Sequence, residues 1–187
     1  MMRHMNWTRL LWMAAIAMLA LLLGTIVAKG YSAFWQTHIA IDVPLDREKI
    51  DPAGTGDPQI IGGADFRAIS RAAIRDHFPE VRERLDRRQL LKLFSNGIGF
   101  TLRDMVLAQQ ELIGTTQRIW LKSSADIDML TKGFLDRDVD QADRRVSNKQ
   151  LDWYDRLVAE GRLDTKFNIT FFAAADSREP EQAGILG

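Results

Sequence analysis

The stretch LLWMAAIAMLALLLGTIVA, residues 10–28, decides how the rest of the chain must be arranged. It carries no charged residue, and as a helix rising about 1.5 Å per residue it would be roughly 28 Å long, close to the ~30 Å hydrocarbon core of a bilayer. Aromatic residues, whose amphipathic rings favour the headgroup region, lie near both ends: Trp7, Trp12, Tyr31 and Trp35. The sequence therefore predicts one membrane-spanning helix.

A buried helix of a soluble domain and a cleaved signal peptide are the two alternatives for this stretch. The rest of the chain is not apolar enough to surround a buried helix. The apolar region of a signal peptide is typically about 7–15 residues long and ends at a small-x-small cleavage site. Here the run is longer, and the best match, Ile26-Val27-Ala28, has a bulky residue first. We therefore expect a retained anchor.

The charges that flank this helix indicate its orientation. Arg3 and Arg9 precede it without an acidic residue, whereas Lys29 is the only Lys or Arg between the helix and Arg47. By the positive-inside rule, residues 1–9 form a cytoplasmic tail and everything after Tyr31 lies outside the cytoplasm.

Composition limits what the remainder can be. After the anchor about 150 residues remain, enough for one ordinary domain with its own core. The 25 basic and 25 acidic residues give a formal net charge of zero, so no net field favours nucleic acid or an anionic surface. Cysteine is absent, which excludes disulfides, thiol catalysis and Cys-ligated metals.

The first half of the predicted domain contains one strand, one long loop and three helices. A short strand is expected over 38–43 and a loop rich in Pro and Gly over 44–63. Asp65 is the predicted N-cap of a helix that runs to Phe78. Pro79 is expected to open a second helix that Asn96-Gly97 ends, and a third is expected over 102–113, ending near Gly114.

The second half alternates strands and helices. A strand is predicted over 116–122, followed by a helix capped by Ser123 or Ser124 and ended by Gly133. Ser147 and Gln150 form a capping box for a helix that Gly161 ends. A clean alternation over 166–172 predicts a last strand. The expected whole is an α+β domain over 31–176, with about three strands packed against four or five helices, and a polar linker over 177–187.

Arginines 84, 87 and 88 are the candidate binding residues, in a basic cluster that also includes Arg82 and Lys92. Phosphate or an acidic partner is the natural ligand of such a cluster. The alternative is a solvated helix face, because Glu80 precedes Arg84 and Glu83 precedes Arg87 by four residues, the favourable order for ion pairs along a helix.

Other patterns give little support for a site. Asp136, Asp138 and Asp140 begin like a calcium loop, but Gln141 stands where Gly is required and Ser147 where a bidentate Glu belongs, which favours a solvated turn. The histidines have no metal-ligating neighbours in sequence: His4, His38 and His77. No catalytic, nucleotide-binding or zinc motif is found. We expect no catalytic, cofactor-binding or metal-binding residues, and no enzymatic activity.

Several segments, in this order and spacing, carry a resemblance to one family: AFWQT at 33–37, LIG at 112–114, SADID at 124–128 with KG at 132–133, RRVS at 144–147, FN at 167–168 and DSREPEQAG at 176–184. The chain resembles the N-terminal extension of PstA, the permease subunit of bacterial phosphate ABC importers, a domain of unknown function. In that family the extension precedes a multi-span permease, which pairs with the PstC permease, is driven by the PstB ATPase and receives phosphate from the PstS binding protein.

The resemblance implies an anchor in the bacterial inner membrane, a periplasmic domain and a linker over 177–187 that leads to a permease bundle. The sequence contains no further membrane spans and no ATPase-coupling loop, so we expect it not to translocate phosphate by itself. We expect it to act through contact or regulation. The loop over 44–63 is expected to be either a mobile surface excursion or a contact loop. A membrane-tethered sensor or signalling input domain, which would share the anchor and the α+β architecture, is the first alternative. A membrane-anchored enzyme is the second, and it would need convergent polar groups in a pocket.

Overall fold

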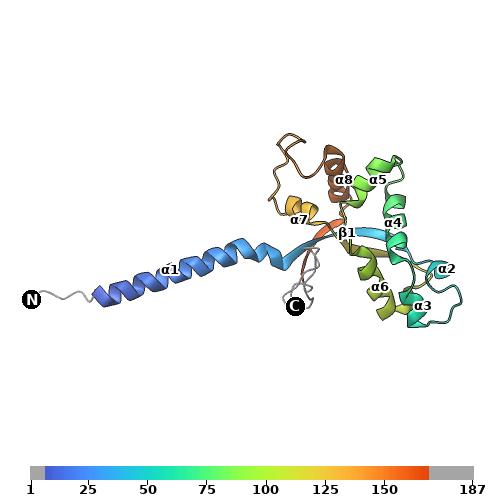
Figure 1. Ribbon diagram of the computed structural model, residues 1–187, viewed down its shortest axis with the longest axis horizontal. Helices are drawn as coiled ribbons and strands as arrows, with labels where there is room; N and C mark the ends of the chain where they lie inside the picture. The colour runs from blue at the N-terminus through green and yellow to red at the C-terminus, as the bar shows by residue number, and fades with distance from the viewer. Residues whose placement is uncertain (1–6, 169–187) are drawn as a thin grey trace, which may run out of the picture.

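A computed structural model describes residues 7–168, apart from a few side chains of the first helix. Figure 1 shows a long helix, α1 (Trp7–Gly30), projecting from a folded domain formed by the remaining elements. A single turn of 3₁₀ helix, η1 (Tyr31–Phe34), joins α1 to the first strand. The predicted linker over 177–187 and most of the predicted tail over 1–9 lie outside the described residues.

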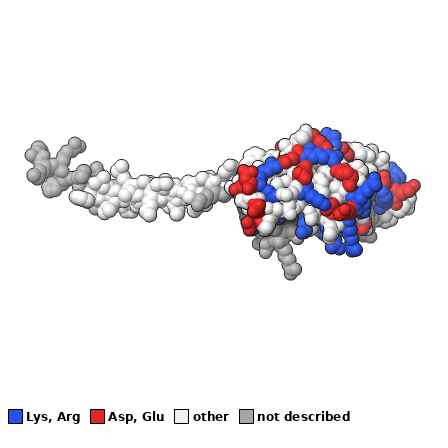
Figure 2. All heavy atoms as spheres, turned by 90° about the horizontal axis from the view of Figure 1, so that it is seen from above, with Lys and Arg blue, Asp and Glu red and all other residues white. Residues whose placement is uncertain are grey.

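α1 is long and apolar enough to cross a membrane. Its segment Leu10–Ala28 has a mean hydropathy of 2.5 and is not buried against the domain. The hydroxyl of Thr25 donates to the carbonyl of Leu21 at 2.7 Å, so this polar group is satisfied within the helix. Figure 2 shows no charged side chain along the described part of α1, whereas acidic and basic side chains are interspersed over the domain.

A three-stranded antiparallel sheet organises the domain. Its order is β2-β1-β3, with β1 (Trp35–Pro44) in the centre, β2 (Thr116–Lys122) on one side and β3 (Leu163–Phe167) on the other. Side chains alternate between the faces of a strand, and the apolar face of β1 is fully buried through Ile39, Ile41 and Val43. The predicted α+β class with about three strands is confirmed.

Helices cover the apolar face of this sheet (Figure 1). They are α2 (Arg47–Ile50), α3 (Pro58–Gly62), α4 (Phe66–His77), α5 (Arg84–Leu91), α6 (Ile98–Ala108), α7 (Ala125–Thr131) and α8 (Asn148–Ala159), with a 3₁₀ turn η2 (Gln110–Leu112). Ile74 and Phe78 from the region of α4 and Leu102 from α6 are fully buried in a core that they share with the β1 residues. The burial of such side chains supplies most of the free energy of folding.

Several predicted elements are confirmed by local contacts. The carboxylate of Asp65 accepts from the amide of Ala68 at 2.8 Å and caps α4. Both hydrogen bonds of the capping box between Ser147 and Gln150 are present at the start of α8. Glycines 133 and 161 have φ of +74° and +66° just after α7 and α8, where a left-handed residue ends a helix. The strand over 116–122 is also found as predicted.

The predicted loop over 44–63 is wrong in part, because it contains α2 and α3. Ile50 and Ile61 are buried in the core, so both short helices are tied to the domain. Between them the carboxylate of Asp51 accepts from the amides of Thr55 at 3.1 Å and Gly56 at 2.8 Å. Residues 52–60 form the longest continuously exposed part of the stretch 44–63.

The predicted start of the second helix at Pro79 is wrong, because α5 begins at Arg84. The amide of Val81 donates to the carbonyl of Phe78 at 3.0 Å, and both side chains are buried, so the chain turns here before it becomes helical. α6 starts earlier than the predicted 102 and ends at Ala108. After η2, the amide of Gly114, with φ +92°, donates to the carbonyl of Leu45 and brings the chain into the sheet.

The strand boundaries also differ from prediction. β1 extends beyond 38–43 at both ends because β3 pairs with its first half and β2 with its second. β3 begins at Leu163 rather than 166, because the amide of Ala40 donates to the carbonyl of Arg162 at 2.8 Å and aligns the chain immediately after Gly161. β3 ends at Phe167, and residues 169–172 of the predicted strand lie outside the described residues.

Candidate functional site

The candidate arginines of α5 are exposed on the surface of the domain. Arg84 and Arg88 are one helical turn apart, so they lie on the same face. Arg87 points elsewhere, since its Nε donates to the carbonyl of Val81 at 3.1 Å and secures the turn before the helix. The structure therefore brings two of the three candidates together and assigns the third a structural contact.

The ion pairs that would explain this cluster as a self-neutralised helix face do not form. Glu80 precedes α5 and binds Arg156 of α8 at 2.7 Å instead of Arg84. Glu83 is the N-cap residue of α5, and within residues 7–168 it forms no ion pair with Arg87. The positive charge of α5 is thus left facing solvent.

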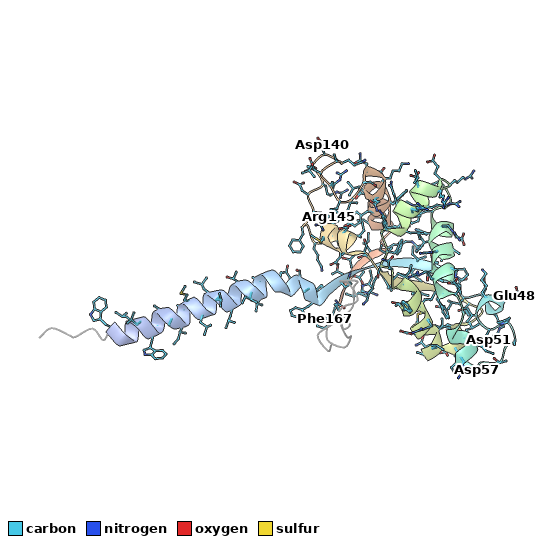
Figure 3. All side chains as sticks on the ribbon, in the orientation of Figure 1. Glu48, Asp51, Asp57, Asp140, Arg145 and Phe167 are labelled. Atoms are coloured by element: carbon cyan, nitrogen blue, oxygen red, sulfur yellow. The ribbon has the colours of Figure 1, made fainter. Side chains whose placement is uncertain are left out.

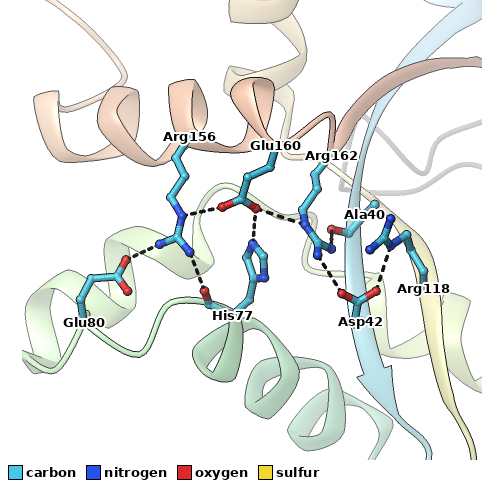
Figure 4. A network of polar contacts seen from close by, with 8 residues as sticks. All are labelled: Ala40, Asp42, His77, Glu80, Arg118, Arg156, Glu160 and Arg162. Carbon is cyan, nitrogen blue, oxygen red and sulfur yellow. Dashed lines mark hydrogen bonds and ion pairs between the residues drawn. The ribbon is translucent and has the colours of Figure 1, made fainter.

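A network of charged side chains joins the end of α4, the end of α8 and the sheet (Figure 4). Arg156 binds Glu160 at 2.7 Å, donates to the backbone carbonyl of His77 at 3.2 Å and lies 4.9 Å over the ring of Phe78. Glu160 also binds His77 Nε2 at 2.9 Å and Arg162 Nε at 3.1 Å. These contacts fasten three segments that are distant in sequence.

The same network continues into the sheet through Asp42 of β1. Its carboxylate binds Arg162 at 2.8 Å on one oxygen and Arg118 of β2 at 2.9 Å on the other. Hydrogen bonds from Arg118 and then Arg162 lower the pKa of Asp42 to about 2. The hydrogen bond from Arg156 likewise lowers the pKa of Glu160. Both oxygens of each carboxylate are already occupied, so the network is suited to holding elements together.

The two histidines of the described region behave as structural groups. Burial is the main cause that lowers the pKa of both His38 and His77, which favours their neutral forms near pH 7. His38 Nδ1 lies 2.9 Å from the carbonyl of Gln36. Within residues 7–168 no group of three His, Asp or Glu side chains could hold a metal ion.

The junction between α1 and the domain is held by a second set of charged residues. Asp128 of α7 accepts from the amide of Thr37 at 2.8 Å and pairs with Lys132, whose Nζ donates to the carbonyl of Trp35 at 2.7 Å. Side chains 128 and 132 are only 13% and 15% exposed. Asp128 and Lys132 thus form hydrogen bonds with backbone groups at the start of β1, beyond the residues that pair with β2. We call these two residues the α7 clamp.

The chain leaves the described domain at the same junction. Trp35, the first residue of β1, is paired with Phe167, the last of β3, and their rings meet edge to face at 5.9 Å. The amide of Asn168 donates to the carbonyl of Phe34 at 2.8 Å. Figure 3 shows Phe167 beside the end of α1, so the strand that follows the anchor and the strand that ends the described domain lie side by side.

A polar pocket of about 290 Å³ lies between α5, α7, α8 and the segment 141–146. Its polar lining includes Gln89, Lys92, Asp126, Gln141, Arg145 and Gln150. Arg145 reaches Asp126 only at 3.7 Å, whereas the neighbouring Arg144 is fully engaged by backbone carbonyls and Asn148.

Asp138, in the calcium-like segment, donates its amide to the Asp136 carboxylate, as in a solvated turn.

Sequence reasoning missed the α7 clamp and the pocket because both depend on residues far apart in the chain. Asp128 and Thr37 are 91 positions apart, and no periodic pattern relates them. Asp128 and Lys132 at i,i+4 would look like an ordinary surface pair. The one local signal is that residues 124–128 and 132–133 are among the segments that carry the family resemblance.

The fold and the junction define an α+β domain carried on an N-terminal apolar helix. The chain belongs to the family described as a domain of unknown function (DUF3333), whose family model matches residues 12–141. That match begins inside α1 and extends past α7, so the apolar helix and most of the domain belong to one family unit. No curated protein and no solved structure matches the chain.

Proposed function

We propose that this chain is the N-terminal anchor and extracytoplasmic domain of the PstA-type permease subunit of a bacterial phosphate ABC importer. The pairing of Trp35 with Phe167 and the bond from Asn168 to Phe34 carry this proposal, because they bring the chain back to the end of α1. A domain inserted between two membrane spans needs its two ends close together in this way. Phosphate as substrate is supported by the sequence resemblance to PstA extensions.

In this proposal α1 crosses the bacterial inner membrane, with residues 1–9 in the cytoplasm and the domain in the periplasm. The partners are the remainder of the PstA permease, the PstC permease, the PstB ATPase and the PstS binding protein. The domain acts by contact or regulation and performs no catalysis. The exposed stretch 52–60 is the part of the predicted contact loop that remains free to meet a partner.

Deletion of the domain from the native gene tests the proposal. Residues 35–168 are replaced by a short Gly-Ser linker, which leaves α1 in place, and membrane fractionation confirms insertion. We expect uptake of radiolabelled phosphate and growth on limiting phosphate to fall several-fold. A smaller deletion of 44–63 is unsuitable, because it would remove Ile50 and Ile61 from the core. Unchanged uptake and growth in the inserted deletion variant would sink the proposal.

The orientation has its own test, since the sequence lacks cysteine. Asp140 is exposed on the segment before α8 (Figure 3), so Asp140→Cys should react with a membrane-impermeant maleimide in intact spheroplasts. Asn6→Cys in the tail should react only after permeabilisation, and the reverse pattern would overturn the periplasmic placement.

Reading the gene beyond residue 187 separates the two function classes: further spans support a permease, whereas a helical linker and a kinase support a sensor.

A further inference from the structure

Three cations form a line along α5. Arg84, Arg88 and Lys92, the C-cap residue, follow one another at four-residue intervals and span about 12 Å at 1.5 Å per residue. All three are exposed, and within residues 7–168 none of them has an ion pair or a side-chain hydrogen bond. Like charges at this spacing repel one another. We call these residues the α5 stripe.

Half of the other Lys and Arg side chains of the described domain are paired with carboxylates. Those in ion pairs are Lys49, Arg103, Arg118, Lys132, Arg137, Arg145, Lys149, Arg156 and Arg162. Next to the α5 stripe, Asp86 pairs with Lys149 at 2.6 Å and Glu80 pairs with Arg156. The exposed N-cap residue Glu83 forms no ion pair within residues 7–168. The α5 stripe is therefore poorly compensated.

The α5 stripe leads into the polar pocket. Lys92 lines the pocket from α5, and Arg145 lines it from the segment before α8. Asp126 is the carboxylate in the lining and meets Arg145 only loosely, at 3.7 Å. The side-chain amides of Gln89 and Gln141, which also line the pocket, can donate hydrogen bonds to carboxylates, whereas the amide of Gln150 already donates to the carbonyl of Gln89 at 3.0 Å. Lys92 thus belongs both to the α5 stripe and to the lining of the pocket.

An exposed apolar residue distinguishes this surface from a site for a small anion. Leu85 follows Arg84 and precedes Arg88 on the same side of α5, and its side chain is 68% exposed. A small oxyanion would use only the pocket and leave Leu85 in water. A polypeptide could cover Leu85 and pair with the α5 stripe at once. A lipid surface is disfavoured because α7 and the segment after it lie nearer to α1 than α5 does (Figure 1).

We propose that the α5 stripe, Leu85 and the polar pocket form a docking surface for an acidic polypeptide segment of a partner protein. Carboxylates of the segment pair with the α5 stripe and the pocket, and an apolar side chain covers Leu85. Electrostatic complementarity of this kind selects the partner and speeds its association. This surface would serve a protein partner whether or not the chain belongs to a phosphate importer.

The test uses the full chain in nanodiscs of zwitterionic lipid and a defined probe. The probe is a fluorescein-labelled 15-residue helical peptide with Glu at four-residue intervals and one Leu, and its binding is followed by fluorescence anisotropy. The stripe variant carries Arg84→Glu, Arg88→Glu and Lys92→Glu. We expect its affinity for the peptide to fall at least about tenfold, since several charge pairs are lost together. Leu85→Ser should weaken binding a few-fold.

The chain offers a matched control on α4. Arg67, Arg71 and Arg75 have the same four-residue spacing and are also exposed, so their replacement by Glu makes the same charge change on another helix. We expect this control to change the affinity by less than about twofold. Circular dichroism melts verify that both variants are folded, and Gln replacements at the α5 stripe provide a milder second variant.

Several outcomes would overturn the proposal. Equal losses in the α4 and α5 variants would show a nonspecific charge effect. If the unmodified chain did not bind the peptide, the proposed docking surface would be contradicted. Displacement of the peptide by low-millimolar inorganic phosphate would indicate a small-anion site. Binding to phosphatidylglycerol vesicles that depends on the α5 stripe, without binding to the peptide, would assign the surface to lipid.

Discussion

Replacing Asp128 with alanine is expected to destabilise the domain by about 3 kcal/mol. The amide of Thr37 is fully buried and would lose its acceptor, which costs about 1–3 kcal/mol. Lys132 would also lose its ionic partner. Removing one member of a fully buried pair costs about 3–5 kcal/mol and of an exposed pair about 0–1, so a pair that is 13–15% exposed contributes about 1–2 kcal/mol.

Thermal unfolding of the full chain in detergent micelles measures this effect. Near-UV circular dichroism follows the tertiary packing of the domain and is insensitive to the helicity of α1. At about 2–4 °C per kcal/mol for a protein of this size, Asp128→Ala should lower the Tm by about 6–12 °C. Asp128→Asn should cause about half this loss, because the amide oxygen can still accept from Thr37.

A control on the same helix makes the prediction specific. Asp126 is also in the first turn of α7, but its side chain is 48% exposed and lies 3.7 Å from Arg145. Asp126→Ala should therefore change the stability by less than about 0.5 kcal/mol. If the alanine variants of Asp128 and Asp126 unfolded at the same temperature, the α7 clamp would not hold the junction as argued.

Two further predictions concern the sheet and the helix packing. Because Arg118 and Arg162 hold the pKa of Asp42 at about 2, below its usual 3.8, the stabilisation it provides is complete above about pH 4 and is lost as the pH falls towards 2. Urea midpoints over this range should become less pH-dependent in Asp42→Asn, and an unchanged slope would contradict the assignment. In Gly99→Ala the new Cβ would lie 3.0 Å from the backbone nitrogen of Arg67, which should separate α4 from α6 and cost about 1–3 kcal/mol in urea unfolding. Gly62→Ala, with its nearest neighbour at 3.8 Å, is the control and should show little change.

The sequence predicted those elements whose ends are set by neighbouring residues. The capping box at Ser147 and Gln150, the Asp65 cap and the strand over 116–122 all depend on contacts within a few positions, and all three are found. The stretch 44–63 was misread because its Pro and Gly residues outweighed a genuine helix start, in which Asp57 caps α3 with Pro58 at the first position.

Predictions failed where distant parts of the chain determine the local structure. Pro79 is compatible with a first helical turn, but the burial of Phe78 and Val81 requires a turn before α5. The candidate arginines were found by composition alone. The sequence could not show that these arginines lack ion pairs, because Glu80 lies before α5 and binds Arg156 of α8 instead of Arg84. The polar pocket likewise requires α5, α7 and α8 to meet.

The direct passage from α1 through η1 into β1 has a mechanical consequence. β1 is the central strand, bonded to β3 along its first half and to β2 along its second, and antiparallel hydrogen bonds run across the strand direction. A pull on α1 along β1 would therefore load these bonds in shear, all at once, rather than unzip them singly. Tension or tilt in the anchor would reach the core of the domain without being absorbed by a slack tether.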